Sequence, residues 1–190
     1  SWGVPGDLSL KPEIAAPGGS VYSINGAVQE TDEYELMSGT SMAAPQIAGI
    51  SALVLQHIQT KGLSQEGLTD RALAQSVMMS TATPLKDEDG QYYPVMQQGA
   101  GLVDTAAATG FDSYVLVDGY ADGKVKTELK DDPTRKGVYS FSFDIHNISD
   151  TQKIYALSAD VFTQNFFEDY SNYNNNDEQT ALYTDTQTTP

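Results

Sequence analysis

The sequence of 190 residues lacks cysteine and is poor in basic residues, with 10 Lys and Arg against 26 Asp and Glu. Without cysteine it has no disulfide, no thiolate metal ligand and no cysteine nucleophile. Its formal net charge of −16 leaves no basic patch to neutralise phosphates, so nucleic acid is excluded as a partner. No run of about 18 apolar residues occurs, and we expect no membrane span in this segment.

The length is enough to bury a core and is typical of one large domain or two small ones. Residues 1–110 mix short strands with helices, whereas after Phe111 the apolar period changes from 3.6 to 2. We predict an α/β part over 1–110, an incomplete all-β sandwich over 111–170 and a polar loop or disordered end over 171–190.

In the α/β part, the pattern predicts two short strands, a solvated acidic loop and three helices. The strands are expected at 11–16, closed by a Pro-Gly turn, and at 21–24, the loop at 30–35, and the helices at 41–59, about 69–80 and 104–109. The helix at 41–59 is apolar almost all round, so we expect it to be buried on several sides. Pro45 is expected in its first turn, where the missing N–H breaks no helical bond.

In the all-β part, two segments with period-2 alternation flank a polar turn at 147–152. The segments 138–146 and 154–161 therefore predict an antiparallel pair. Weaker strands are expected at 113–118 and 124–129. Four strands are fewer than the roughly seven of a complete sandwich, so the sandwich is expected to be incomplete.

The segment Gly39–Pro45, which reads Gly-Thr-Ser-Met-Ala-Ala-Pro, places a serine where a glycine turn enters the long helix. A helix start offers free N–H groups and a partial positive charge, which stabilise an oxyanion formed beside them. Gly39 permits the close approach of a substrate carbonyl. The pattern Gly-x-Ser alone also fits Ser41 as a helix N-cap, so the residues leave a nucleophile and a cap both open.

The whole string Gly39–Pro45, followed by Gln46-Ile47-Ala48-Gly49, resembles the nucleophile signature of the subtilisin-like serine proteases, the subtilases. Gln46 stands where many members carry a His that is not catalytic. The segments Leu10–Gly18 and Gln98–Asp104 are similar to further parts of the same catalytic domain, in the same order. This resemblance covers about 1–110 and implies the C-terminal portion of a parallel-sheet α/β catalytic domain.

Residues 111–165 resemble the fibronectin-III-like sandwich that follows the catalytic domain in large cell-envelope proteinases of Gram-positive bacteria, the lactocepin-like branch. The two resemblances together imply an extracellular protein, either secreted or associated with the cell wall. They imply polypeptide substrates and no cofactor for the chemistry. Structural Ca²⁺ is common in the family, and the turn Asp87–Gly90 could bind it, although this turn equally fits a plain reversal of the chain.

The resemblance also implies roles for the residues around the predicted nucleophile. The Ser41 hydroxyl attacks the scissile carbonyl and becomes acylated, and its backbone N–H is one donor of the oxyanion hole. Thr40 supports that hole indirectly, and Gly39 lies at the substrate. Met42 follows the nucleophile and should make the activity sensitive to oxidation.

The catalytic Asp and His, and the Asn that completes the oxyanion hole, belong upstream of Ser1 in this family. His57 lies about 24 Å along the helix from Ser41, at 1.5 Å per residue, and is expected to be a half-buried helix residue. His146 is expected at the surface. Because a nucleophile without its base retains little activity, we expect this chain alone to hydrolyse nothing and to need the N-terminal portion as a partner.

Two other functions stay open on the residues alone. An α/β-hydrolase could use Ser41 with Asp104 or Asp118 and His146, but Ala43 replaces the second glycine of its Gly-x-Ser-x-Gly elbow. A non-catalytic surface-binding or spacer module would rest on the all-β part.

Overall fold

The computed structural model describes residues 9–25, 34–166 and 183–188. Within these ranges the helices are α1 (Thr40–Lys61), α2 (Asp70–Ser80), α3 (Val95–Gln98) and α4 (Thr105–Thr109). The strands are β1 (Val21–Ile24), β2 (Tyr34–Met37), β3 (Ser113–Val117), β4 (Phe143–Asn147), β5 (Val161–Phe166) and β6 (Tyr183–Thr188). They form three two-stranded antiparallel sheets, β1–β2, β3–β4 and β5–β6.

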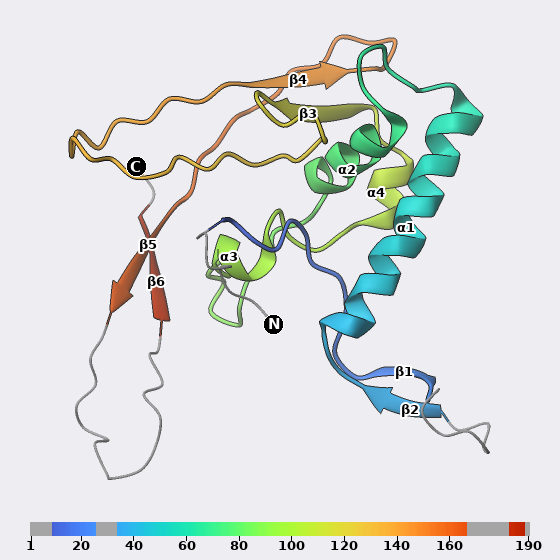
Figure 1. The fold of residues 1–190 in the computed structure, drawn as a ribbon, viewed down its shortest axis with the longest axis horizontal. Coiled ribbons are helices and arrows are strands. Elements are labelled where there is room, and N and C mark those ends of the chain that lie inside the picture. The colour runs from blue at the N-terminus through green and yellow to red at the C-terminus, as the bar shows by residue number, and fades with distance from the viewer. Residues whose placement is uncertain (1–8, 26–33, 167–182, 189–190) are drawn as a thin grey trace.

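Helices α1, α2 and α4 and strand β3 surround one apolar core (Figure 1). Its buried members are Val54, Ile58, Leu73, Ala74, Val77, Met78, Val103, Ala108, Phe111 and Tyr114. Two serines of α2 fix β3 to the core, because the Ser76 hydroxyl donates to the Val115 carbonyl at 2.5 Å and Val115 N–H donates to the Ser80 hydroxyl at 2.9 Å. Each large apolar side chain buried here stabilises the fold by about 1.5–3 kcal/mol.

The predicted long helix is confirmed as α1, and its end is fixed by Gly62, whose left-handed backbone (φ 64°, ψ 37°) closes the last turn. The expected place of Pro45 is wrong. The helix begins at Thr40, so Pro45 is its sixth residue and cannot donate a helical hydrogen bond to the Ser41 carbonyl.

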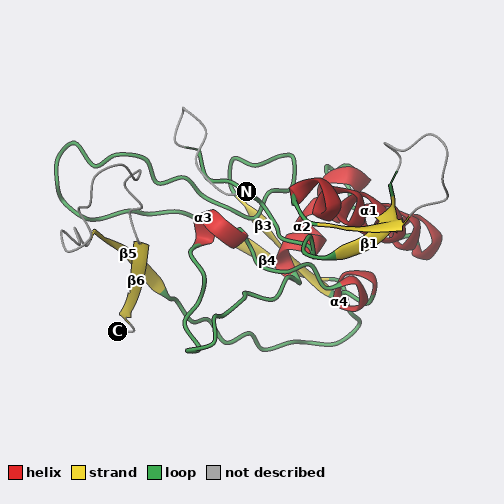
Figure 2. Cartoon of the chain, turned by 90° about the horizontal axis from the view of Figure 1, so that it is seen from below, coloured by secondary structure: helices red, strands yellow, loops and turns green. Residues whose placement is uncertain are grey.

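The expected burial of α1 on several sides is also wrong for the part of the chain that the structure describes. Only Val54 and Ile58 are buried in this helix, and Leu53 is 50% exposed. The helix packs mainly on α2 and α4, which lie beside it (Figure 2), and apolar side chains such as Leu53 stay exposed.

Helices α2 and α4 confirm the predictions for 69–80 and 104–109. Each starts with a side-chain cap: Thr69 Oγ1 accepts from Ala72 N–H at 3.2 Å, and Asp104 Oδ1 accepts from Ala107 N–H at 2.9 Å. Helix α3 was not predicted, because four residues after Pro94 are too few to show a helical period.

The strand expected at 11–16 is reduced to a single parallel bridge between Ala15 and Leu102. Ala15 N–H donates to the Gly101 carbonyl at 2.8 Å, and Val103 N–H donates to the Ala15 carbonyl at 2.9 Å. A β-ladder needs a neighbouring strand several residues long, and within the described ranges no such strand lies beside residues 11–16. The helices and strands of the first part fit an α/β class, but its parallel sheet stays a prediction.

In the second part, the predicted pairing is wrong. The strand β4 covers only part of the expected 138–146, and it pairs with β3 rather than with 154–161. Residues 154–160 and 124–129 form no strand. Of the four expected strands, that at 113–118 is confirmed as β3 and that at 138–146 only in part as β4. Alternation indicates a face of a strand but does not identify the partner strand. The sandwich and the boundary at residue 110 stay predictions, although Phe111 and Tyr114 join the core.

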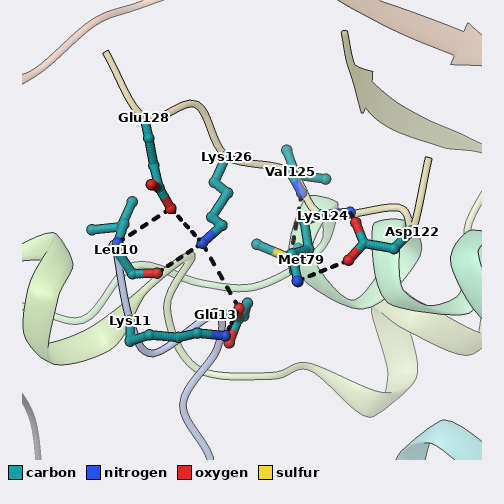
Figure 3. A network of polar contacts seen from close by, with 9 residues as sticks. All are labelled: Leu10, Lys11, Glu13, Met79, Asp122, Lys124, Val125, Lys126 and Glu128. Atoms are coloured by element: carbon teal, nitrogen blue, oxygen red, sulfur yellow. Dashed lines mark hydrogen bonds and ion pairs between the residues drawn. The ribbon is translucent and has the colours of Figure 1, made fainter. Parts of the chain in front are cut away.

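Residues 122–128 are held in place by side-chain hydrogen bonds and ion pairs rather than by pairing with a β-strand (Figure 3). The Lys126 ammonium, only 8% exposed, donates to the Leu10 carbonyl and to Glu128 Oε1, both at 2.9 Å, and lies 3.9 Å from Glu13 Oε1. Next to this network, a hydrogen bond from Lys124 lowers the pKa of Asp122 below its ordinary value. These contacts fix the segment against the chain that leads toward β1.

Two predicted loops contain strands instead. Within the acidic stretch 30–35, Tyr34 and Glu35 belong to β2, while 30–33 lie outside the described residues. Within the polar end 171–190, residues 183–188 form β6 and pair with β5. No helix in the described ranges is long and apolar enough to cross a membrane.

Candidate active site

The turn before α1 depends on Gly39, the N-cap of the helix, whose φ of 155° and ψ of 167° disfavour any residue with a side chain. Its N–H donates to the Gly18 carbonyl at 2.7 Å. Its carbonyl accepts from Met42 N–H at 3.0 Å and from Ala43 N–H at 3.4 Å. Gly39 therefore starts the helix and leaves the amides of the next two residues outside the helical bonding pattern.

Ser41 is the second residue of α1 and is exposed. The cap interpretation is wrong, because Gly39 is the cap and no side chain caps this helix. Neither the Ser41 hydroxyl nor its N–H hydrogen-bonds to a described residue. Among the described residues, the hydroxyl and the amide of this serine therefore lie together without a hydrogen-bond partner.

Thr40 is the first residue of α1 and is exposed beside Ser41. The first turn contains no acidic side chain. The partial positive charge of the helix start is therefore not offset by a carboxylate of that turn, which favours negative charge on an atom placed beside it.

A second turn, from Pro17 to Ser20, supports the first. A Cβ added at Gly18 would lie 2.7 Å from the Gly39 carbonyl oxygen, so only glycine allows this approach. Ser20 N–H donates to the Ser38 hydroxyl at 2.8 Å. The two turns are therefore locked together directly before the serine.

Gln46 joins the same support, and the sequence did not reveal this role. Its amide nitrogen donates to the Pro17 carbonyl at 2.5 Å and to the Met42 carbonyl at 3.3 Å. The signal available in the sequence was its position, little more than one helical turn after Ser41. Gln46 fastens the helix start to the Pro17–Gly18 turn.

Both histidines lie toward the opposite end of α1 from Ser41. His57 is half-buried, as expected, with its ring 6.2 Å from the Phe111 ring. His146 is not at the surface as expected: it is half-buried and stacks on Tyr114, with ring centroids 4.9 Å apart. The Phe111 and Tyr114 rings are themselves 6.4 Å apart, so the four rings form one cluster beside the core.

The residues of the α/β-hydrolase alternative are not brought together. Asp104 caps α4, Asp118 is exposed after β3, and His146 belongs to the ring cluster. No imidazole or carboxylate among the described residues hydrogen-bonds to Ser41.

Of the three acidic side chains in the turn Asp87–Gly90, that of Asp87 hydrogen-bonds locally, because its Oδ1 accepts from Asp89 N–H at 3.0 Å and from Gln91 N–H at 2.9 Å. Among the described residues, no group of three His, Asp or Glu side chains could hold a metal ion. A calcium site stays an unassigned prediction.

Comparison with known proteins gives a consistent set of relatives. The model of the subtilase family matches residues 1–108. A C5a peptidase of Streptococcus pyogenes serotype M1 is 36% identical over 164 residues, 86% of this chain and 13% of that protein. The PII-type proteinase of Lactococcus lactis subsp. cremoris is 33% identical over 182 residues, 84% of this chain and 9% of that protein. The chain spans only a small part of the length of either relative.

Proposed function

This chain belongs to the subtilase family, and from that premise we propose that it supplies the nucleophile of a serine endopeptidase. The Ser41 oxygen attacks the scissile carbonyl of a polypeptide, and its proton passes to a histidine base. The amine leaves with that proton, and water then releases the acyl group. The Ser41 N–H donates to the oxyanion of each tetrahedral intermediate.

The observation that carries this proposal is the pairing of a free hydroxyl and a free amide at the first turn of α1. An exposed serine elsewhere on a helix would offer the hydroxyl alone, because its amide would be bonded to the preceding turn. Gly39 leaves the space beside the Ser41 amide open to a substrate carbonyl, because a Cβ at this position would lie 3.8 Å from the Ser41 nitrogen.

The catalytic Asp and His and the second oxyanion donor are assigned to a part of the whole protein that precedes this sequence. The small share of its relatives that this chain spans supports this assignment. The chain alone should therefore be inactive. In the same way, we assign residues 111–170 to the start of a fibronectin-III-like sandwich and the whole protein to the cell exterior.

A fluorophosphonate probe, which reacts with activated serines, tests the proposal. The whole protein should be labelled, whereas the 190-residue chain alone and the Ser41→Ala variant of the whole protein should not. Ser23→Ala, which removes an exposed hydroxyl of β1, is the matched control and should label as the wild type does. A whole protein that never labels would favour the non-catalytic binding module.

A further inference from the structure

Lys126 is the most deeply buried cation among the ion pairs of the described residues. Its side chain is 8% exposed, whereas the other lysines in these ion pairs are between 26% and 42% exposed. Burial of an ammonium costs free energy unless oxygen atoms replace its water. The Leu10 carbonyl and Glu128 Oε1 do so, and Glu13 Oε1 lies 3.9 Å away (Figure 3). A buried cation therefore contacts the backbone of a segment far away in the sequence.

The segment that carries Lys126 also packs on α2. A Cβ added at Gly123 would lie 1.9 Å from the Ala72 carbonyl oxygen, so only glycine allows this approach. Val125 N–H donates to the Met79 sulfur at 3.4 Å. The match to the subtilase model ends at residue 108. These contacts therefore come from residues beyond the part of the chain that shows the family.

The network around Lys126 holds both polar groups of the Leu10 backbone. The Leu10 carbonyl accepts from Lys126, and the Leu10 N–H donates to Glu128 Oε1 at 3.3 Å. Since Glu128 Oε1 also accepts from Lys126, the three residues form a closed ring of hydrogen bonds. Leu10 belongs to no helix or strand, so side chains here replace the backbone partners that an element would supply. The ring thereby fixes the beginning of residues 10–18.

Residues 10–18 lead from this ring to the turn beneath the nucleophile. At the far end, the Gly18 carbonyl accepts from Gly39 N–H at 2.7 Å. Between the two ends, Ile14 and Ala16 pack against the core. Closely packed segments transmit a displacement because they have little free volume to absorb it. A shift at the beginning of this segment is therefore expected to move the turn that supports Ser41.

We propose that Lys126 is a positioning residue for the reaction at Ser41. Its ammonium holds residues 10–18, and these residues place the Gly18 carbonyl that fixes Gly39 directly before the nucleophile. Lys126 acts through this segment and not by contact with the substrate. The inference rests on the proposed function. It makes the rate of the chemical step depend on a residue that lies outside the part of the chain matched by the family model.

The experiment uses the whole protein and a chromogenic peptide substrate, with kcat expressed per fluorophosphonate-titrated site. Misfolded molecules do not titrate, so a loss of stability alone leaves this quantity unchanged. Lys126→Met keeps the apolar stem of the side chain and removes the ammonium. Its kcat should fall about tenfold, because the nucleophile is displaced, while KM stays within about twofold. Lys126→Arg restores a cation with donors, and its kcat should return to within about threefold of the wild-type value.

A double variant tests the route through the turn. Gly18→Ala displaces the turn directly, because its Cβ would lie 2.7 Å from the Gly39 carbonyl oxygen. If Lys126 acts through the same turn, Lys126→Met should lower kcat much less in the Gly18→Ala background than in the wild type. Full additivity of the two effects on kcat would contradict this route.

Two controls separate positioning from general damage. Lys124→Met removes another ammonium of the same segment, whose ion pair with Asp122 at 2.8 Å stays within that segment. Ile58→Ala weakens the core at a fully buried side chain. Both should leave kcat per titrated site unchanged. If Lys126→Met yields no folded protein, Glu128→Ala removes the other side chain that holds Leu10 and should lower kcat several-fold.

Three results would overturn the inference. An unchanged kcat for Lys126→Met would mean that the core contacts of residues 14 and 16 place the turn without the ammonium. A higher KM with unchanged kcat would mean that the segment binds substrate instead. Equal losses in Lys126→Met and Lys126→Arg would mean that the fit of the side chain matters and not its charge. A wild-type protein that the probe never labels would instead contradict the proposed function.

Discussion

The two ends of α1 differ in almost every physical property. At its C-terminal half, Val54 and Ile58 are fully buried and His57 packs against Phe111. At its start, Gly39, Thr40 and Ser41 are exposed and held by backbone hydrogen bonds rather than by apolar packing. One end of the helix stabilises the fold, and the other presents reactive groups on a support built from turns.

The comparison predicts that changes at the two ends act on different measurements. The largest effect should come from Ser41→Ala, which removes the nucleophile and leaves an exposed site otherwise intact. The kcat of the whole protein should fall by about 10⁴-fold or more, with the thermal midpoint unchanged. Steady-state hydrolysis and a thermal melt of the same preparation test this, and substantial residual activity would contradict the assignment.

At the opposite end, Ile58→Ala should lower the free energy of unfolding by about 2–5 kcal/mol, because it leaves a cavity in the core. The activity per titrated site should stay the same. Leu53→Ala, at a side chain that is half exposed in this structure, is the control and should lower the free energy of unfolding much less. Denaturant unfolding measures both, and equal losses would show that the whole protein buries Leu53 as well.

The support of the nucleophile can be tested at two neighbouring glycines. A Cβ at Gly18 would meet the Gly39 carbonyl at 2.7 Å, whereas a Cβ at Gly19 would meet nothing within 4 Å. Gly18→Ala should therefore displace the turn and lower kcat about 100-fold, with Gly19→Ala as the matched control. Similar activities for the two variants would mean that the turn shifts without consequence.

The smallest effect is expected for Gln46→Leu, which keeps the size of the side chain but removes its hydrogen bonds to Pro17 and Met42. The loss of these bonds should lower the free energy of unfolding by about 1 kcal/mol and lower kcat a few-fold. Gln56→Leu, an exposed position on the same helix, should change neither quantity. If Gln46→Leu also changes neither the free energy of unfolding nor kcat, the hydrogen bonds from Gln46 to Pro17 and Met42 are not needed for stability or catalysis.

The sequence predicts the features set by neighbouring residues better than those set by contacts between distant segments. The helices α1 and α2 and the position of Ser41 could be predicted because periodicity, caps and the signature string are local signals. The partner of β4 and the pairing of 183–188 could not, since alternation does not identify a neighbour and a Thr-rich strand has little apolar pattern. The role of Gln46 needed the fold, because its partner Pro17 is 29 residues away.

The most direct test of the central claim is a structure of the whole protein after reaction with an organophosphonate inhibitor. We expect a covalent bond from phosphorus to the Ser41 oxygen, with a phosphonyl oxygen about 2.7–3.1 Å from the Ser41 backbone nitrogen. An adduct on another residue, or a phosphonyl oxygen turned away from that amide, would contradict the account.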